Sequence, residues 1–374
     1  YKHGLRTTKI KLEKFEFIPY GRQDIIKDDI EAVVKVLHSD FLTQGAVVPL
    51  FEKELCDYAG AEYSIVVNSC TSALHIACLA LGLSKGDILW TSPITFVASA
   101  NCALYCGADI DFVDIEPDTA LMSVEKLTDK LVLAEIEGKL PKIVIPVHFA
   151  GQSCDMKDIY NLSKQYGFKI IEDAAHAIGA KYKNQPVGSC KYSDITVFSF
   201  HPVKIITTGE GGAAMTNSLY LSEKMNLLRS HGITRDPDKM CNNQNNAWYY
   251  EQVKLGFNYR MTDIQAALGI SQLKRLDQYV LRRSKIAKWY GRQLKDKPID
   301  PLMQKSDRDS AHHLYIVRIR DGEQVRNKIY NNLHENGIGV NLHYIPVYRH
   351  PFFNKKIYME NSEYHYAHSI TLPI

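Results

Sequence analysis

The chain has 374 residues, of which 45% are hydrophobic, and its formal net charge at pH 7 is +3. This length predicts one large and one smaller domain, and the charge is too small and too evenly mixed to indicate a nucleic-acid or membrane surface. No apolar run could span a bilayer and residues 1–16 lack the apolar centre of a signal peptide, so we expect a cytoplasmic protein with small-molecule partners. Eight cysteines without a CxxC pair indicate neither a disulfide framework nor a metal site.

Short apolar runs alternate with helical patterns over the first 260 residues. Residues 1–16 have no clear periodicity and are interpreted as an extension, and a helical pattern follows from Asp28 to Leu37. The runs and helices expected next are strands at 63–67, 88–91, 110–113, 143–147, 169–171, 195–200 and 213–216, and helices at 71–81, 96–105 and 156–166. Because strands separated by helices of about ten residues form βα units, this alternation predicts a mostly parallel sheet covered on both faces.

The pattern changes after Asn258. Residues 261–297 form a charged and apolar stretch that predicts a long helix linking two domains. A smaller α+β unit is expected to follow, with strands at 313–319 and 338–344 and a helix at 323–336 that ends at Gly337. The predicted domains are therefore a large one at 17–274 and a small one at 275–374, after the extension at 1–16.

The segment at 197–212, VFSFHPVKIITTGEGG, places Lys204 in a polar turn between two apolar runs. A lysine at a strand end, partly shielded from water, loses proton affinity and can bond covalently to an aldehyde. Pyridoxal phosphate is the commonest aldehyde held in this way. A surface lysine in a glycine-rich hairpin fits the same residues, so both alternatives stay open at this point.

Three upstream features could complete a cofactor site. The turn at 69–72, SCTS, places hydroxyls and free N–H groups at a helix start, which suits a phosphate but also an ordinary N-cap. Asp173 follows an apolar strand at the sheet edge where ligands of α/β proteins bind, and could hold a pyridinium nitrogen. His176 could contact the same ligand, unless it and Asp173 cap a helix. Phe96 could stack on a cofactor ring or pack in the core.

The joint order of these features is that of fold-type-I pyridoxal-phosphate enzymes. The strings NSCTSALH, SPITFVASAN, EDAAHAIGA, VFSFHPVK and GFNYRMTDIQAALG resemble the DegT/DnrJ/EryC1/StrS sugar aminotransferases, and the resemblance covers nearly all of residues 18–374. It implies an α/β fold with a mostly parallel seven-stranded sheet in a large domain and a smaller α+β C-terminal domain. Because similar enzymes continue beyond a motif like SITLPI, the small domain is expected to be incomplete.

The resemblance also implies a role for each matching position. Lys204 matches the lysine that holds pyridoxal 5′-phosphate, and Asp173 matches the acid at the ring nitrogen, so both are expected to be catalytic. The further cofactor contacts that it implies are Thr71, Ser72, Phe96, His176, Ser199 and Asn258. Asn258 would come from the second subunit of a homodimer with a shared active site. The implied substrate contacts are Tyr20, Asp40, Phe41, Leu42, Thr43, Cys70, Ser199, Asn258, His343, Tyr344, Ile345 and Pro346.

The implied reaction moves the amino group of L-glutamate to C4 of a UDP-linked 4-keto-6-deoxy-N-acetylhexosamine. It leaves 2-oxoglutarate and uses pyridoxamine phosphate as the second form of the cofactor. The strings IPYGRQDI, DFLTQG, LRSHGITRD and IGVNLHYIPV carry a narrower likeness to family members of pseudaminic acid biosynthesis. Arg229, His231 and Arg260 are candidates for the UDP diphosphate.

Three other readings of the sequence compete with this one. A family aminotransferase for a different epimer or nucleotide, and a non-catalytic descendant of the fold, both stay open. A sugar 3-dehydratase of the same family is disfavoured, because the similar dehydratases have histidine where this chain has Lys204. Cys70 stands where many members have glycine, so the backbone approach to a phosphate or substrate is expected to be tighter there.

Overall fold

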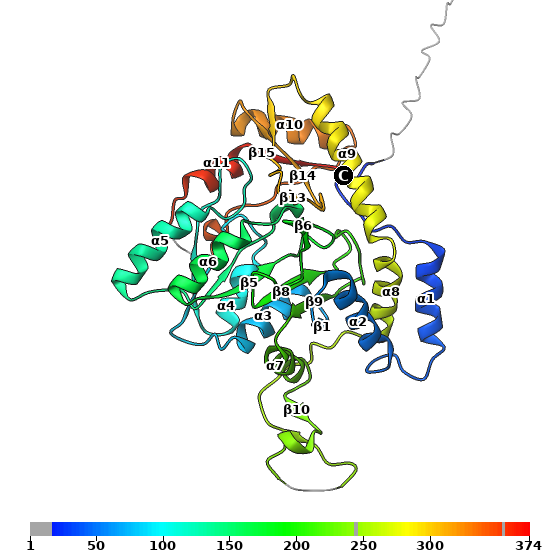
Figure 1. The fold of residues 1–374 in the computed structure, drawn as a ribbon. Coiled ribbons are helices and arrows are strands. Elements are labelled where there is room, and N and C mark those ends of the chain that lie inside the picture. Colours follow the sequence, from blue (N-terminus) through cyan, green and yellow to red (C-terminus); the bar gives the residue numbers. More distant parts are fainter. Residues whose placement is uncertain (1–16, 243–245, 354–355) are drawn as a thin grey trace, which may run out of the picture.

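The computed structural model describes residues 17–242, 246–353 and 356–374 (Figure 1). The extension expected at residues 1–16 lies outside the described residues. The helices are α1 Lys27–Leu37, α2 Val47–Ala59, α3 Cys70–Ala80, α4 Ala98–Tyr105, α5 Val124–Glu137, α6 Met156–Tyr166, α7 Leu219–Arg229, α8 Asp263–Leu273, α9 Leu276–Gln293, α10 Glu323–Glu335 and α11 Glu360–His368. None of the helices in these ranges is long and apolar enough to cross a membrane.

Seven strands form the central sheet, in the order β1-β9-β8-β5-β4-β2-β3. They are β1 Tyr63–Val67, β2 Ile88–Thr91, β3 Asp109–Phe112, β4 Ile143–Ile145, β5 Lys169–Asp173, β8 Ile195–Ser199 and β9 Gly212–Thr216. Strands β8, β5, β4, β2 and β3 pair in parallel, whereas β9 is antiparallel to both β1 and β8. This confirms the predicted α/β fold with a mostly parallel sheet.

Helices cover both faces of this sheet. Successive side chains of a strand point to opposite faces, and because both sets are apolar, both faces must be covered. In β1, Ile65 and Val67 pack with α3, α4 and α7, whereas Val66 packs with α2 and α8 on the other face. Farther along the sheet, Val144 and Ile170 pack with α5 and α6 on that second face. The apolar runs read from the sequence are therefore strands whose side chains are buried on both faces of the sheet.

A second, antiparallel sheet in the order β12-β14-β15 lies beside the first (Figure 1). Its strands are β12 Ile299–Pro301, β14 Tyr315–Ile319 and β15 Ser369–Leu372, and α9 and α10 pack against it. The shorter strands are β6 Lys181–Tyr182, β7 Gln185–Pro186, β10 Ile233–Thr234, β11 Glu251–Gln252 and β13 Arg308–Asp309. The pair β10 and β11 lies on an arm that projects from the large sheet beyond α7 (Figure 1).

Three expectations about local structure were wrong. The helix expected over 96–105 begins at Ala98, so Phe96 lies in the preceding turn. The single helix expected over 261–297 is divided into α8 and α9, and Arg275 at the break binds Asp29 of α1. The strand expected over 338–344 is replaced by isolated bridges, which pair Ile338 with Ile18 and Asn341 with Thr371. Periodicity did not predict α2 or α5.

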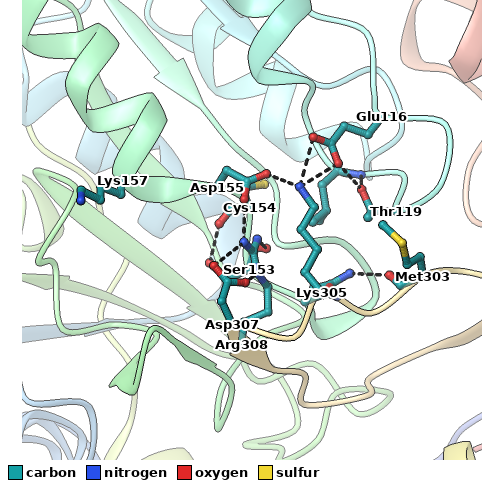
Figure 2. Close-up of polar contacts among 12 residues, drawn as sticks. Glu116, Thr119, Ser153, Cys154, Asp155, Lys157, Met303, Lys305, Asp307 and Arg308 are labelled. Atoms are coloured by element: carbon teal, nitrogen blue, oxygen red, sulfur yellow. Dashed lines mark hydrogen bonds and ion pairs between the residues drawn. The ribbon is translucent and has the colours of Figure 1, made fainter.

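A network of charged side chains joins residues 303–308 to the loops that carry Glu116 and Asp155 (Figure 2). Lys305 lies between Glu116 and Asp155, with Nζ 3.0 Å from Glu116 Oε2 and 2.5 Å from Asp155 Oδ2. Arg308, whose side chain is buried, donates to Asp155 Oδ1 and to the carbonyl of Ser153. Burial alone would raise the pKa of Asp155, but hydrogen bonds from Lys305 and Arg308 outweigh it and lower that pKa. The network therefore fixes the segment that leads into β14.

Replacing Asp155 with asparagine should destabilise the fold. The variant Asp155→Asn leaves Lys305 and Arg308 without their shared anion, so we expect a loss of about 2–3 kcal/mol in the free energy of unfolding. Urea unfolding followed by circular dichroism measures this loss. Asp57→Asn is the matched control, since it removes an exposed pair with Lys53 and should leave the midpoint unchanged. Equal midpoints for the two variants would contradict the account.

Candidate active site

A cavity of about 520 Å³ opens at the carboxyl ends of β5 and β8. The predicted site residues that line it are Tyr20, Cys70, Thr71, Phe96, Asp173, His176, Ser199, Lys204, His343 and Tyr344. They come from segments between residues 20 and 344, and the parallel strands bring them to one edge. Phe96 is 61% exposed. The structure therefore assembles most of the residues that the sequence singled out.

Lys204 lies in the turn between β8 and β9. Its backbone N–H donates to the carbonyl of His201 at 2.9 Å, which holds the turn. Its Nζ makes no hydrogen bond or ion pair within the part of the chain that the structure describes. Burial lowers the pKa of Lys204 to about 8, although Cys70 and Asp173 act in the opposite direction. About a tenth of the amine is therefore neutral, and nucleophilic, at pH 7, far more than for an ordinary lysine.

Asp173 ends β5 and is 5% exposed. On one side, its backbone N–H donates to the carbonyl of Pro146 and its carbonyl accepts from the N–H of His148. On the other side, the N–H of the next residue, Ala174, donates to the carbonyl of Val197. Its Oδ1 accepts from the N–H of Ala175 at 3.1 Å and its Oδ2 accepts from the Ser99 hydroxyl at 2.6 Å. No cationic nitrogen of the described residues lies within 4.0 Å of this carboxylate. Because burying a carboxylate without a cationic partner costs free energy, a positively charged group of a ligand would stabilise it.

The start of α3 forms the third part of the site. Ser69 caps the helix by accepting from the N–H of Ser72, and the N–H groups of Cys70 and Thr71 have no hydrogen-bond partner among the described residues. Gly212 of β9 pairs with Ser199 and lies so close that a Cβ atom would be 2.5 Å from Cys70 N. This glycine lets the helix N-terminus and the Ser199 hydroxyl face the same space, which suits a phosphate.

Two neighbouring histidine rings, tilted relative to each other, form another part of the cavity wall. The rings of His176 and His313 lie 4.5 Å apart, and Nε2 of His176 is 3.2 Å from the hydroxyl of Tyr344. Burial, followed by the nearby Lys204, lowers the pKa of His176 well below its ordinary value, so the ring is neutral. Nδ1 of each ring is buried without a hydrogen-bond partner in the described residues. The cavity wall therefore contains two ring nitrogens whose hydrogen-bonding capacity is not used within the described residues.

Several predicted residues do not line this cavity. The Ser72 hydroxyl donates to Asn68 Oδ1 at 2.6 Å, and Asn258 pairs with Ser230 at the base of the arm. The other predicted residues outside the cavity are Asp40, Phe41, Leu42, Thr43, Ile345 and Pro346. Residues 40–43 are exposed on the surface, and the loop continues into Gly45, whose N–H donates to Asp263. In a single protomer these residues are therefore not part of the cavity lining.

A second hollow of about 540 Å³ lies beside the arm. Its lining includes His231, Arg235, Arg260 and, from the exposed loop, Gln44. Arg229 is absent from this lining, because its guanidinium binds Glu52, the carbonyl of Val66 and Asn226. The expectation that Arg229 is free to bind a diphosphate was therefore wrong, whereas His231 and Arg260 do lie together.

Sequence reasoning missed several residues that line the cavity. The polar ones among them are Thr95, Ser99, His201, Glu210, His313 and Asn341. Thr95 and Ser99 lie in the string SPITFVASAN, where a four-residue spacing between hydroxyls on either side of Phe96 was a usable signal. His313 had no signal, because it reaches the cavity through backbone bonds of its neighbours Ala311 and Leu314 to residues 150–151.

The profile of the DegT/DnrJ/EryC1/StrS aminotransferase family matches residues 23–374 of this chain. The chain belongs to this family. It is 39% identical over 361 residues to the UDP-4-amino-4,6-dideoxy-N-acetyl-β-L-altrosamine transaminase of Campylobacter jejuni, covering 95% of this chain and 92% of that protein. The family resemblance inferred from the sequence is thereby confirmed.

Solved structures of family members have the same fold. Helicobacter pylori PseC, described as an aminotransferase of pseudaminic acid biosynthesis, matches with a TM-score of 0.87 and 32% identity over 96% of this chain and 94% of its own. The sugar aminotransferase Spr1654 of Streptococcus pneumoniae, in its PLP form, matches with a TM-score of 0.84 and 29% identity over 96% and 93%. The chain is therefore a pyridoxal-phosphate-dependent nucleotide-sugar aminotransferase.

The cavity suits this cofactor on three grounds. Lys204 has an unpaired amine with a lowered pKa, and Asp173 is a buried carboxylate that lacks a cation. The start of α3 offers free N–H groups to an anion, next to the Ser199 hydroxyl. An aldehyde, a protonated ring nitrogen and a phosphate are the three groups that these features select.

Proposed function

We propose that this enzyme transfers the amino group of L-glutamate to C4 of UDP-2-acetamido-2,6-dideoxy-β-L-arabino-hexos-4-ulose, a step of pseudaminic acid biosynthesis. The observation that carries the proposal is the 39% identity, over 95% of the chain, to a transaminase named for the 4-amino product of this sugar class. The solved PseC structure supports it through the shared fold. The alternative is a related aminotransferase for another epimer or nucleotide, and incubation with the two C5 epimers of the UDP-4-keto sugar separates the two epimers.

Lys204 and Asp173 carry the chemistry in this proposal. When bound, pyridoxal phosphate accepts the electron pair released at the donor Cα and carries the amino group between substrates. Lys204 Nζ would hold the cofactor covalently and, once released, would take the proton from the donor Cα. Its lowered pKa, about 8, increases the share of neutral amine available for that transfer. The Asp173 carboxylate would hold a proton on the ring nitrogen.

The remaining cavity residues would position the cofactor and the sugar. Thr71, Ser199 and the N-terminus of α3 would bind the phosphate, and His176 would contact the ring. Phe96, exposed at the cavity, offers an aromatic face to the ring. Tyr20, Cys70, His343 and Tyr344 line the remaining wall and would contact the sugar.

A homodimer would complete the site. Asn258, residues 40–43 and the hollow with His231 and Arg260 lie outside this protomer's cavity, as expected of groups lent to a partner subunit. The arm beyond α7 also exposes large apolar side chains, with Trp248 70% and Leu255 78% exposed, which a partner would cover. The arginines of the hollow would then supply charge for the UDP diphosphate.

The donor half of the reaction can be tested without any sugar. Adding L-glutamate to the purified enzyme should remove the visible absorbance of its bound cofactor and release one 2-oxoglutarate per active site. D-glutamate is the control and should leave the spectrum unchanged. If L-glutamate also leaves the spectrum unchanged while the cofactor is bound, the donor assignment fails.

A further inference from the structure

Two buried hydroxyls form a chain that ends on the Asp173 carboxylate. Thr95 Oγ1 lies 2.8 Å from Ser99 Oγ, and Ser99 Oγ donates to Asp173 Oδ2 at 2.6 Å. The exposed fractions of Thr95, Ser99 and Asp173 are 3%, 1% and 5%. Ser99 is the second residue of α4 and Thr95 lies in the turn before this helix, so the helix start sets their spacing. The chain thus links the α4 start to β5.

The hydrogen bonds in this chain have a fixed direction. An ionised carboxylate can only accept, so the single hydroxyl hydrogen of Ser99 points to Asp173. Ser99 must then accept from Thr95, whose hydrogen is committed to Ser99 in turn. The other acceptor within reach of Ser99 is the carbonyl of Phe96 at 3.4 Å, which is too long to compete with a bond of 2.6 Å.

Each oxygen of the carboxylate therefore already has one donor. Ser99 occupies Oδ2 and the N–H of Ala175 occupies Oδ1, and each oxygen keeps one further lone pair. Two donors from different elements prevent rotation of the carboxylate group. The two remaining lone pairs therefore keep a fixed direction.

We propose that Ser99, oriented by Thr95, is a positioning residue that keeps the Asp173 carboxylate aimed at the ring nitrogen of the cofactor. The inference rests on the proposed role of Asp173. Without the Ser99 hydroxyl, the carboxylate keeps the single donor of Ala175 and is free to rotate away from the ring nitrogen. The ring nitrogen then loses the acceptor that holds its proton, and the ring becomes a weaker electron acceptor.

Three variants test this inference in the holoenzyme. We expect Ser99→Ala to lower kcat about 10-fold to 100-fold, since a hydrogen bond to a charged group is lost, and to leave the KM for the sugar within twofold. In the same variant the NMR signal of the cofactor's ring nitrogen should shift toward its unprotonated position. Thr95→Val keeps the shape but removes the donor to Ser99, so it should shift both quantities in the same direction by less. Ser92→Ala is the control, because Ser92 is a nearby buried serine whose hydroxyl has no partner among the described residues.

Asp173→Asn measured in parallel separates the two hypotheses. If Asp173→Asn moves the ring-nitrogen signal and Ser99→Ala and Thr95→Val do not, Ser99 has no positioning role and the inference is overturned. If Asp173→Asn also leaves the signal unchanged, the proposed role of Asp173 itself fails. Should Ser99→Ala not fold, the ring-nitrogen signal of Thr95→Val decides, and a value equal to that of Ser92→Ala would contradict the inference.

Discussion

Lys204→Ala should lower turnover by about 1,000-fold or more, because general acid–base transfer by a positioned side chain contributes about 10²-fold to 10⁴-fold. The amine is the group of the cavity with a free Nζ and a pKa lowered to about 8 by burial. Its loss would remove both the covalent hold on the cofactor and the proton carrier. Steady-state turnover with saturating L-glutamate and sugar measures the effect.

Two further measurements make this prediction specific to the amine. Added methylamine should restore part of the activity of Lys204→Ala, because a small free base can enter the vacated space. Lys53→Ala replaces an exposed lysine of α2 and should turn over like the wild type. Turnover of Lys204→Ala within tenfold of the wild type would show that another residue moves the proton.

Asp173→Asn should lower kcat by about 10²-fold to 10³-fold, as expected when a charge aimed at a developing transition state is removed. The same change should not lower the stability of the cofactor-free protein, because the native carboxylate is buried there without a cation. Turnover of the holoenzyme and urea unfolding of the cofactor-free protein measure the two effects. A loss of kcat without a loss of stability is the result expected for a residue that serves the reaction and not the fold.

The preceding residue of the same strand provides a matched comparison. Glu172 hydrogen bonds to His148, Ser193 and Thr196. Burial would raise its pKa, but these bonds, led by that of His148, lower it. Glu172→Gln should therefore cost about 2–4 kcal/mol of unfolding free energy with a smaller loss of kcat than Asp173→Asn. The opposite ranking, with Asp173→Asn the more destabilising, would contradict the assignment of Asp173 to the cofactor.

The sequence predicted the large sheet because its strands are buried on both faces. Runs such as residues 63–67 and 195–199 are mostly apolar and almost entirely buried, so the βα alternation was visible from periodicity alone. The break between α8 and α9 was not visible, since it depends on Arg275 binding Asp29, which lies 246 positions away in the chain. Phe96 was placed inside a helix for a different reason, because a sequence pattern does not locate helix ends to within one or two residues.

The candidate site was predicted where residues end strands or begin helices. Lys204, Asp173 and Thr71 were found in this way, and the structure places all three around one cavity. Ser99 and His313 were missed, because their position depends on tertiary contacts with Asp173 and His176. Residues 40–43 and Asn258 lie outside the cavity of one protomer, so their roles depend on a second chain that sequence spacing cannot place.

The proposed reaction of this enzyme is amination at C4 of one specific UDP-4-keto sugar. The measurement that tests it most directly is NMR identification of the product after incubation with L-glutamate and each of the two C5 epimers of the UDP-4-keto-6-deoxy-N-acetylhexosamine. We expect the β-L-arabino epimer to give a 4-amino sugar with one 2-oxoglutarate released per product, and the other epimer to react far more slowly. Amination of the other epimer alone, or of neither epimer by an enzyme that still reacts with L-glutamate, would contradict the proposed function.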